Sequence, residues 1–355
     1  MTRLRLERRS ETPQWLNLTL PLIAIAATLV ICSGLVALAD ANVLAAYRQL
    51  FLTPFSTRFD LVQTAVKAAP LVLTGLAVTV AFRAKFWNIG GEGQLYAGAM
   101  AAAFIGTQPG LAAGALWPLM LVAGALAGAA WALLPALLRT RFKVDDVVTT
   151  LLLNFILLYG MSALLDGPWK NPLSAYPTSP SIRPEAEFPV LPGTSQLHLG
   201  VLVALLAAPS IWFIVNRTTL GFAIKAVGQN PAAAAYAGIR TNAIILATAA
   251  LSGALAGLAG VGEVGGLHYQ VMADLSPGYG YTGIVIAMLA RLNPLGTVPA
   301  AIFFAVVITG AEGMSRATGV PVFLADVIQG VSLLAMLTAL LFTQYRLRLA
   351  SPGHA

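Results

Sequence analysis

The chain has 355 residues, of which 58% are hydrophobic and only 10% are charged, whereas about a quarter of an average soluble protein is charged. A soluble fold of this length could not bury so much apolar surface, so the composition predicts a polytopic membrane protein. The net charge is +7, and the positions of the basic residues explain it better than nucleic-acid binding does. The single cysteine, Cys32, excludes an intrachain disulfide.

Apolar runs predict about ten transmembrane helices and therefore an all-α fold. The predicted spans cover residues 16–39, 61–82, 94–107, 112–138, 147–165, 197–215, 243–263, 281–292, 297–315 and 322–342. The third and eighth are too short for a straight crossing, and interrupted helices of this kind need protein or water around them. The first span is longer than the roughly 7–15 apolar residues of a secretory signal, so we expect an uncleaved anchor.

The basic residues also predict an orientation. With the N-terminus in the cytoplasm, 15 of the 21 Lys and Arg residues fall on the cytoplasmic side, five fall outside, and Lys67 lies within a span. This is the positive-inside distribution, so both termini should be cytoplasmic. The expected organisation is a basic N-terminus at 1–15, one transmembrane domain at 16–345 and a tail at 346–355. A proline-rich outer segment, 166–196, should form an ordered rim.

The polar residues 217–242 are predicted to form a cytoplasmic loop that contains one short helix with both ends marked. Asn230 is a typical N-cap, Pro231 suits the first helical position, and Gly238 can end the helix in a left-handed conformation. The predicted helix, 231–237, is too short to be stable alone, and its alanine face has little side-chain bulk. We interpret it as the joint where a soluble motor pushes on a membrane channel. The residues assigned to this coupling are Gly228, Asn230, Pro231, Ala232, Ala233, Tyr236 and Gly238.

The run Asn-Ile-Gly-Gly-Glu-Gly-Gln at 88–94 interrupts the apolar pattern, because three glycines in four positions break a helix. A carboxylate near membrane depth costs about 2.5–3.5 kcal/mol, so Glu92 should face a cavity or a partner. One interpretation is a broken helix beside a translocation path, with the amides of Asn88 and Gln94 offering hydrogen bonds. The other is a tight turn in which Glu92 caps a helix or pairs with a nearby basic residue.

The span that follows residue 144 begins with two aspartates, Asp145 and Asp146, which suit the first turn of a helix. Helix capping is the interpretation that we favour for both. Thr149, Thr150 and Asn154 can line a polar face of this helix. The candidate translocation-path residues are Asn88, Glu92, Gln94, Asn154 and Tyr159.

The sequence Gly-Ala-Leu-Ala-Gly occurs at 124–128 and again at 253–257. Each copy is a small-xxx-small pattern that lets helices approach closely. Coincidence explains the recurrence as well as an ancestral repeat does, and the packing interpretation holds in either case.

Several chemistries are disfavoured. The five lysines are followed by Ala, Phe, Val, Asn and Ala, whereas a Walker A loop needs Lys followed by Ser or Thr. ATP hydrolysis by that mechanism would therefore belong to another polypeptide. His198 and His268 are isolated, and no His/Cys cluster predicts a metal site.

Four carboxylates lie in or near predicted spans, namely Glu92, Glu263, Glu312 and Asp326. They leave open an ion-coupled secondary transporter, but no His or Lys stands at a spacing that makes a proton relay obvious. Hydrogen bonding between helices is the favoured explanation.

Four stretches, in the same order along the chain, resemble sequence motifs of the permeases of ABC importers of the branched-chain amino acid/ribose type. The first, Phe-Arg-Ala-Lys-Phe-Trp-Asn-Ile-Gly-Gly-Glu-Gly-Gln at 82–94, has the form of the nucleoside/simple-sugar subgroup, which works with a Bmp-like binding lipoprotein. The others are 145–154, 221–238 and 278–296. The resemblance covers roughly residues 61–342. Asp146 stands where the family usually has Glu, and Ala290 where Gly is common.

This resemblance implies a permease subunit in a bacterial inner membrane, without enzymatic activity or a cofactor of its own. The implied partners are an ABC ATPase that binds ATP, a second and different permease, an outer binding protein and the lipid bilayer, but no nucleic acid. Nucleosides are the expected substrates. Simple sugars and branched-chain amino acids are the alternatives within this class, and the ion-coupled transporter is the alternative outside it.

Overall fold

The computed structural model describes residues 3–8, 14–38, 40–194, 196–319, 327, 330–331, 334–335, 338–339 and 345–350. The chain forms two compact units. Unit 1 consists of Met1–Ser56 and Val307–Ala355, and unit 2 is Thr57–Val306. Helix α12 (Thr297–Thr318) contributes to both. The predicted last span, 322–342, and the end of the tail, 351–355, lie largely or wholly outside the described residues.

Unit 1 contains two helices, α1 (Gln14–Leu38) and α2 (Val43–Ser56), together with the second part of α12. The first predicted span is confirmed as a helix, whereas α2 was not predicted. A Cβ atom at Gly310 of α12 would lie only 1.9 Å from the carbonyl oxygen of Leu50 in α2. The backbones of these two helices therefore touch.

Unit 1 also contains the described strands of the chain, β1 (Arg3–Arg8) and β2 (Tyr345–Ala350). They pair antiparallel, with Arg3 opposite Ala350 and Arg8 opposite Tyr345. Apart from this pair, the described elements are helical, as predicted. The exception falls at the two ends of the chain, where alternating polar and apolar residues favour a strand. The pairing brings the two basic ends of the chain together.

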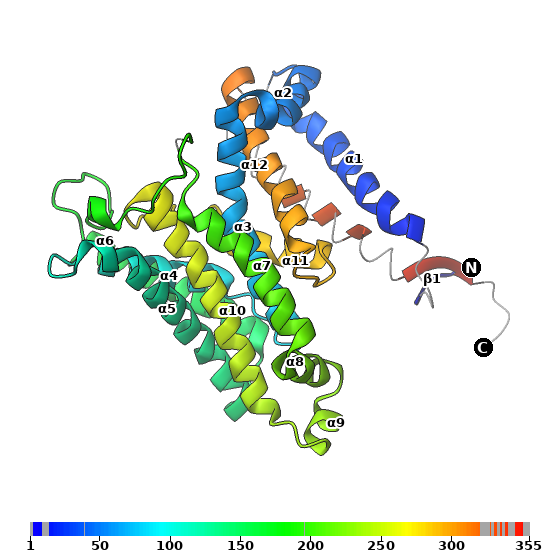
Figure 1. The fold of residues 1–355 in the computed structure, drawn as a ribbon. Coiled ribbons are helices and arrows are strands. Elements are labelled where there is room, and N and C mark those ends of the chain that lie inside the picture. The colour runs from blue at the N-terminus through cyan, green and yellow to red at the C-terminus, as the bar shows by residue number, and fades with distance from the viewer. Residues whose placement is uncertain are drawn as a thin grey trace. The chain divides into compact units, whose positions relative to one another are not determined.

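Unit 2 is helical and carries the segments singled out by sequence (Figure 1). Its elements are α3 (Arg58–Arg83), α4 (Gly91–Gly106), α5 (Ala113–Phe142), α6 (Asp146–Asp166), the 3₁₀ turn η1 (Pro184–Ala186), α7 (Leu199–Arg217), α8 (Thr219–Gln229), α9 (Pro231–Tyr236), α10 (Thr241–Glu263), the π-helical turn η2 (Val264–His268), α11 (Tyr279–Leu289) and the first part of α12.

The described residues include six helices that are long and apolar enough to cross a membrane. They are α3, α5, α6, α7, α10 extended by η2, and α12, so the polytopic prediction is confirmed at this level. Helices α4 and α11 are shorter, with 16 and 11 residues, as expected for the third and eighth spans.

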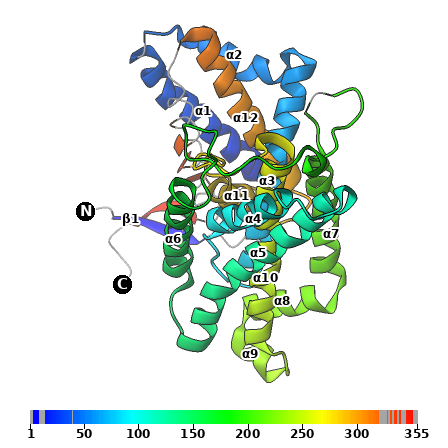
Figure 2. The ribbon, with the colours of Figure 1, turned by 90° about the vertical axis from the view of Figure 1, so that its left-hand side faces the viewer.

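Helices α4, α5 and α10 meet along a seam of glycines, which we call the glycine seam (Figure 2). A Cβ atom at Gly128 of α5 would lie 2.2 Å from the carbonyl oxygen of Gly253 in α10, and one at Gly257 would lie 2.3 Å from that of Gly124. A Cβ at Gly98 of α4 would lie 2.2 Å from the oxygen of Gly257. The two Gly-Ala-Leu-Ala-Gly copies therefore pack against each other, which confirms the close-packing interpretation.

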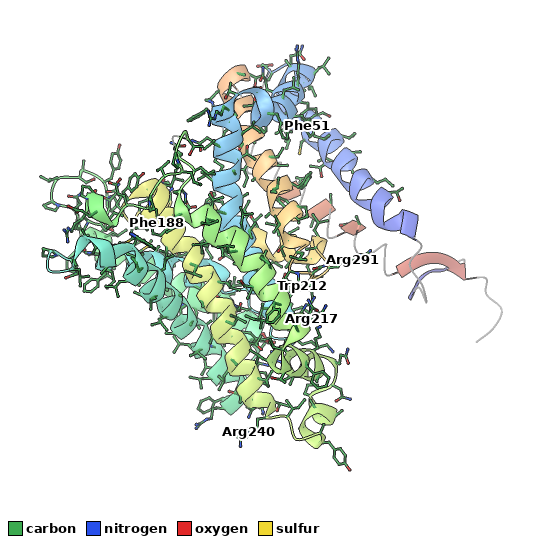
Figure 3. The ribbon with its side chains drawn as sticks, in the orientation of Figure 1. Phe51, Phe188, Trp212, Arg217, Arg240 and Arg291 are labelled. Atoms are coloured by element: carbon green, nitrogen blue, oxygen red, sulfur yellow. The ribbon has the colours of Figure 1, made fainter. Side chains whose placement is uncertain are left out.

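The proline-rich segment that was predicted to be outer, 166–196, lies beside the residues between α10 and α11. The backbone N–H of Phe188 donates to the carbonyl of Gly265 at 2.7 Å, and that of Ile182 donates to Tyr269 at 2.8 Å. Phe188 and Arg240 mark opposite ends of unit 2 in Figure 3. The outer segment and the polar 217–242 segment thus lie at opposite ends, as the predicted orientation requires.

His198 fixes the junction between this outer segment and α7. Its Nδ1 accepts a hydrogen bond from the backbone N–H of Gly200 at 3.1 Å. Because Nδ1 accepts this bond, that nitrogen carries no proton and the imidazole is in its neutral form. In the sequence this histidine is isolated, and the structure shows that it caps a helix.

We expect Gly257→Ala to destabilise the protein by about 1–3 kcal/mol, because the new methyl group would overlap a backbone oxygen that cannot move independently. Gly262→Ala is the matched control on the same helix, since a Cβ atom at that position would have nothing within 4 Å. Alanine there should be neutral or stabilising by up to about 1 kcal/mol. Thermal unfolding in detergent measures both variants, and equal effects would contradict the seam.

Candidate functional site

Helix α9 is fixed at both ends as the sequence predicted, although it stops at Tyr236, one residue early. The side-chain oxygen of Asn230 accepts hydrogen bonds from the backbone N–H groups of Ala232 and Ala233, both at 3.1 Å. Gly238 has φ +82°. Its N–H donates to the carbonyl of Ala235, and the next N–H donates to that of Ala234. These bonds form a Schellman motif, which confirms the left-handed cap.

The outward side of α9 is open. Ala234 is buried, but Tyr236 is 97% exposed, and the other residues of the helix are exposed as well. Ala234 belongs to an apolar cluster with Phe82 and Phe86, which lie at the end of α3 and just after it. The helix is therefore anchored by one alanine and presents the rest of its surface outward at the end of unit 2 (Figure 1).

The polar segment around α9 is not a loop, contrary to the expectation. Residues Thr219–Gln229 form α8, whose first turn is capped by the hydroxyl of Thr218. Gly228 is buried, and a Cβ at that position would lie 1.8 Å from the carbonyl oxygen of Arg83. Gly228 lets α8 touch the end of α3, and its assignment to the coupling stays a prediction. Polarity alone did not reveal that one side of this segment faces inward.

The 88–94 run lies after α3 and includes the first turn of α4. The side-chain amides of its residues Asn88 and Gln94 are hydrogen-bonded to each other. Asn88 donates to the side-chain oxygen of Gln94 at 2.9 Å, and Gln94 donates back at 2.8 Å. Asn88 also donates to the hydroxyl of Ser252, which in turn donates to the carbonyl of Ala77. Both amides are about 1% exposed. They hold the broken helix together, so the structural interpretation of the run is the one that these bonds favour.

Glu92 closes the N-terminus of another helix. It is 3% exposed, and its Oε2 accepts a hydrogen bond from the backbone N–H of Gly280 at 2.7 Å, in the first turn of α11. Gly278, just before that helix, has φ +89°. A carboxylate at a helix N-terminus satisfies otherwise unpaired amides and complements the helix dipole. Glu92 therefore connects the start of α4 to the start of α11.

A row of polar side chains on α6 holds the 87–93 backbone, and we call Asp146, Thr150 and Asn154 the polar stripe. Asp146 Oδ2 accepts from the N–H of Trp87 at 2.6 Å, and Thr150 Oγ1 accepts from that of Ile89 at 3.2 Å.

Asn154 makes three hydrogen bonds, two of them to the backbone of residues 89 and 93. Its oxygen accepts from the N–H of Gly93 at 2.9 Å, and its amide donates to the carbonyl of Ile89 at 3.0 Å and to the hydroxyl of Tyr281 at 3.2 Å. The i, i+4, i+8 spacing is the sequence signal that could have identified the stripe.

Asp146 is not merely a helix cap, contrary to the favoured interpretation. Asp145 caps α6 by accepting from the N–H of Val148 at 2.9 Å. Asp146 instead forms an ion pair with Arg139, at the end of α5. The same guanidinium donates to the carbonyl of Lys85 at 2.8 Å and lies 5.7 Å from the ring centre of Phe86. Sequence reasoning missed Arg139 because it counted only as a cytoplasmic charge.

Tyr159 does not join the other candidate path residues. It is 72% exposed and stacks on Phe155, with 6.4 Å between ring centres. Asn88, Glu92, Gln94 and Asn154 lie together in the interior, whereas Tyr159 lies on the outward face of α6. Helical periodicity explains the separation, because residues 154 and 159 are five positions apart and face different directions.

Residues 61–337 match the family described as the branched-chain amino acid transport system / permease component. The chain belongs to this permease family. The permease is 36% identical to the glucose ABC transporter permease protein TsgB13 of Haloferax volcanii, over 98% of this chain and 94% of that protein. It is 35% identical to the guanosine ABC transporter permease protein NupP of Bacillus subtilis, over 90% of this chain and 92% of that one.

The nucleoside ABC transporter permease protein NupB of Lactococcus lactis is 32% identical to the permease, with 87% of each chain covered. A second guanosine permease protein of Bacillus subtilis, NupQ, is 30% identical over 68% of this chain and 78% of its own. No solved structure matches the permease.

Two of the remaining carboxylates in or near the predicted spans pair with a residue close to them in the chain. Glu263, the last residue of α10, is buried with its Oε2 at 3.4 Å from His268 Nε2. Glu312 lies 4.0 Å from Arg316 on the same helix, and Asp326 is outside the described residues. Among the described residues, no group of three His, Cys, Asp or Glu side chains could hold a metal ion.

We expect Asn154→Ala to destabilise the permease by about 2 kcal/mol or more, because the N–H of Gly93 and the carbonyl of Ile89 would be left buried without partners. Asn216→Ala is the matched control, since that exposed amide donates within its own helix, to the carbonyl of Trp212. Thermal unfolding of the purified chain compares the two. A loss at residue 154 no larger than at residue 216 would show that the polar stripe does not hold the run.

Proposed function

We propose that this permease is the membrane subunit of an ATP-driven importer for nucleosides, and that α9 receives the movement of a separate ATPase. The observation that supports the coupling role most strongly is α9 itself, a short helix with both ends hydrogen-bonded and an exposed alanine surface. Such a helix is rigid for its length and can dock closely in a groove. Since the chain has no Walker A lysine, the ATPase would be another polypeptide.

The surroundings of α9 support the same proposal. Arg217, Lys225 and Arg240 lie on α7, α8 and the start of α10 around it, and Figure 3 labels the first and last of them. They would favour a partner with an acidic rim. Gly228 places α8 in contact with the end of α3. A displacement of α8 and α9 would therefore act directly on residues 84–93, which link α3 to the first turn of α4.

The substrate proposal rests on the relatives named for guanosine and for nucleosides. It agrees with the neutral amides and hydroxyls buried in unit 2, because a nucleoside is recognised by stacking and neutral hydrogen bonds. A simple sugar is the second candidate, favoured by the similarity to a permease named for glucose. A nucleoside includes a sugar ring, so a small change in a shared binding site could switch its preference between nucleosides and simple sugars. Branched-chain amino acids are the weakest candidate, because only the family description supports them.

We further propose a second, different permease as partner, a Bmp-like binding protein at the outer rim, and a location in a bacterial inner membrane. The two guanosine permease proteins of one organism, NupP and NupQ, both resemble this chain and support a pair of unlike permeases. About ten crossings with both ends in the cytoplasm fit the pairing of β1 with β2, since paired ends lie on one side of a membrane.

The coupling role predicts that Tyr236→Ala weakens binding of the ATPase by about 30-fold, because an exposed aromatic at the centre of a docking surface is a typical hot spot. Tyr176→Ala is the matched control at the opposite end of unit 2, where that side chain is 77% exposed. Co-purification of the ATPase with each full-length variant is the measurement. Retention of the ATPase by Tyr236→Ala, or its loss from Tyr176→Ala, would contradict the proposed site.

The substrate proposal predicts ATP-dependent uptake of labelled guanosine by the complete importer in vesicles, with unlabelled nucleosides competing at least about tenfold better than glucose. The reverse order would favour the sugar candidate. The permease alone should move neither compound under an ion gradient. Uphill uptake by the chain without its partners would establish the secondary transporter instead.

A further inference from the structure

Helix α6 is attached to the rest of unit 2 in an unusual way. In its first half, the buried side chains are Asp146, Thr150 and Asn154, all of them polar, and apolar burial begins only at Met161. Of the apolar side chains near them, Leu152 and Ile156 are 54% and 60% exposed, and Val147 and Leu153 are only partly buried. The fully buried contacts of this half of α6 are therefore directional hydrogen bonds and one ion pair.

The contrast with α5 and α10 is sharp. Those helices meet at the glycine seam, where their backbones are in direct contact. Hydrogen bonds between a side chain and a backbone can break and re-form with a shifted partner, and they do so in discrete steps. Within unit 2, the first half of α6 is therefore the element whose hydrogen bonds to its neighbours can change while the seam stays intact.

The first half of α6 is bonded to residues 84–93, which link α3 to the first turn of α4 and which we call the 84–93 run. This run also contacts α8 and α9, the helices proposed to face the ATPase. On one side, Gly228 of α8 faces the backbone of Arg83 and of Ala84, the first residue of the run, and Phe86 shares an apolar cluster with Ala234 of α9. On the other side, Arg139 and Asp146 bond the backbone of residues 85 and 87. The run therefore contacts α8 and α9 on one side, and it is hydrogen-bonded by side chains of α5 and α6 on the other.

We propose that the Arg139–Asp146 pair and the polar stripe form a joint through which displacement of α8 and α9 moves α6. The inference rests on the proposed coupling role of α9. Arg139 and Asp146 are positioning residues in this scheme, because they act through the backbone of residues 85 and 87. The ion pair holds the run and the first turn of α6 together, so that both move when the run is pushed.

The test follows the position of α6 in the complete importer. A cysteine at Leu152, in a Cys32→Ala background, reports the exposure of α6 through its rate of maleimide labelling. With Asp146 intact, we expect ATP and vanadate to change this rate by about fivefold or more. Asp146→Asn should abolish the change and reduce guanosine uptake per ATP hydrolysed by about tenfold.

Asp145→Asn is the matched control, because it removes the neighbouring charge but keeps a side chain that can cap α6. Asp146→Glu keeps both the ion pair and the acceptor, so it should retain coupling. Arg139→Gln should reproduce Asp146→Asn, and it decides the test if the latter does not assemble. Co-purification of the ATPase establishes that each complex is assembled.

Two results would overturn the proposal. In the first, ATP leaves labelling at residue 152 unchanged in the background protein. In the second, assembled Asp146→Asn and Arg139→Gln complexes keep both the labelling change and tight coupling. Either result leaves the coupling role of α9 standing if Tyr236→Ala still releases the ATPase. If Tyr236→Ala has no effect, the coupling role itself fails.

Discussion

Backbone-to-backbone contact between α4, α5 and α10 is the constraint on which unit 2 depends. Inside a membrane, apolar side chains gain little by leaving lipid for protein, so helices associate through close packing and polar bonds. Glycines at 98, 124, 128, 253 and 257 permit that packing here. They also explain why the polar network of the 88–94 run can be complete, because Asn88 reaches Ser252 of α10 only if the helices stand this close.

The polar bonds of unit 2 have a different character from the seam. Glu92 closes the N-terminus of α11, the amides of Asn88 and Gln94 satisfy each other, and Asn154 completes the backbone of the broken helix. In an apolar environment each such group would be costly if left alone. These bonds therefore specify one arrangement of the run, and a switch to another arrangement has to exchange several of them together.

Much of this could be predicted from the sequence, where the signal is local. Hydropathy located the long helices to within a few residues, Asn230 and Gly238 marked the ends of α9, and repeated small residues indicated close helix packing. Failures occurred where the deciding contact is distant in the chain. Asp146 looked like a cap because its partner Arg139 lies on another helix, and the contact of Gly228 with Arg83, at the end of α3, has no local signal in the sequence. Tyr159 was grouped with Asn154 by span, although the helical turn separates them.

The central claim is that unit 2 combines a rigid seam with one movable helix, driven from outside the chain. Paired spin labels in the complete importer test it most directly, one pair between α5 and α10 and another between α6 and α10. On trapping the ATP-bound state, the account predicts an unchanged α5–α10 distance and a shifted α6–α10 distance. A shift within the seam, or an α6 that stays fixed while transport proceeds, would contradict it.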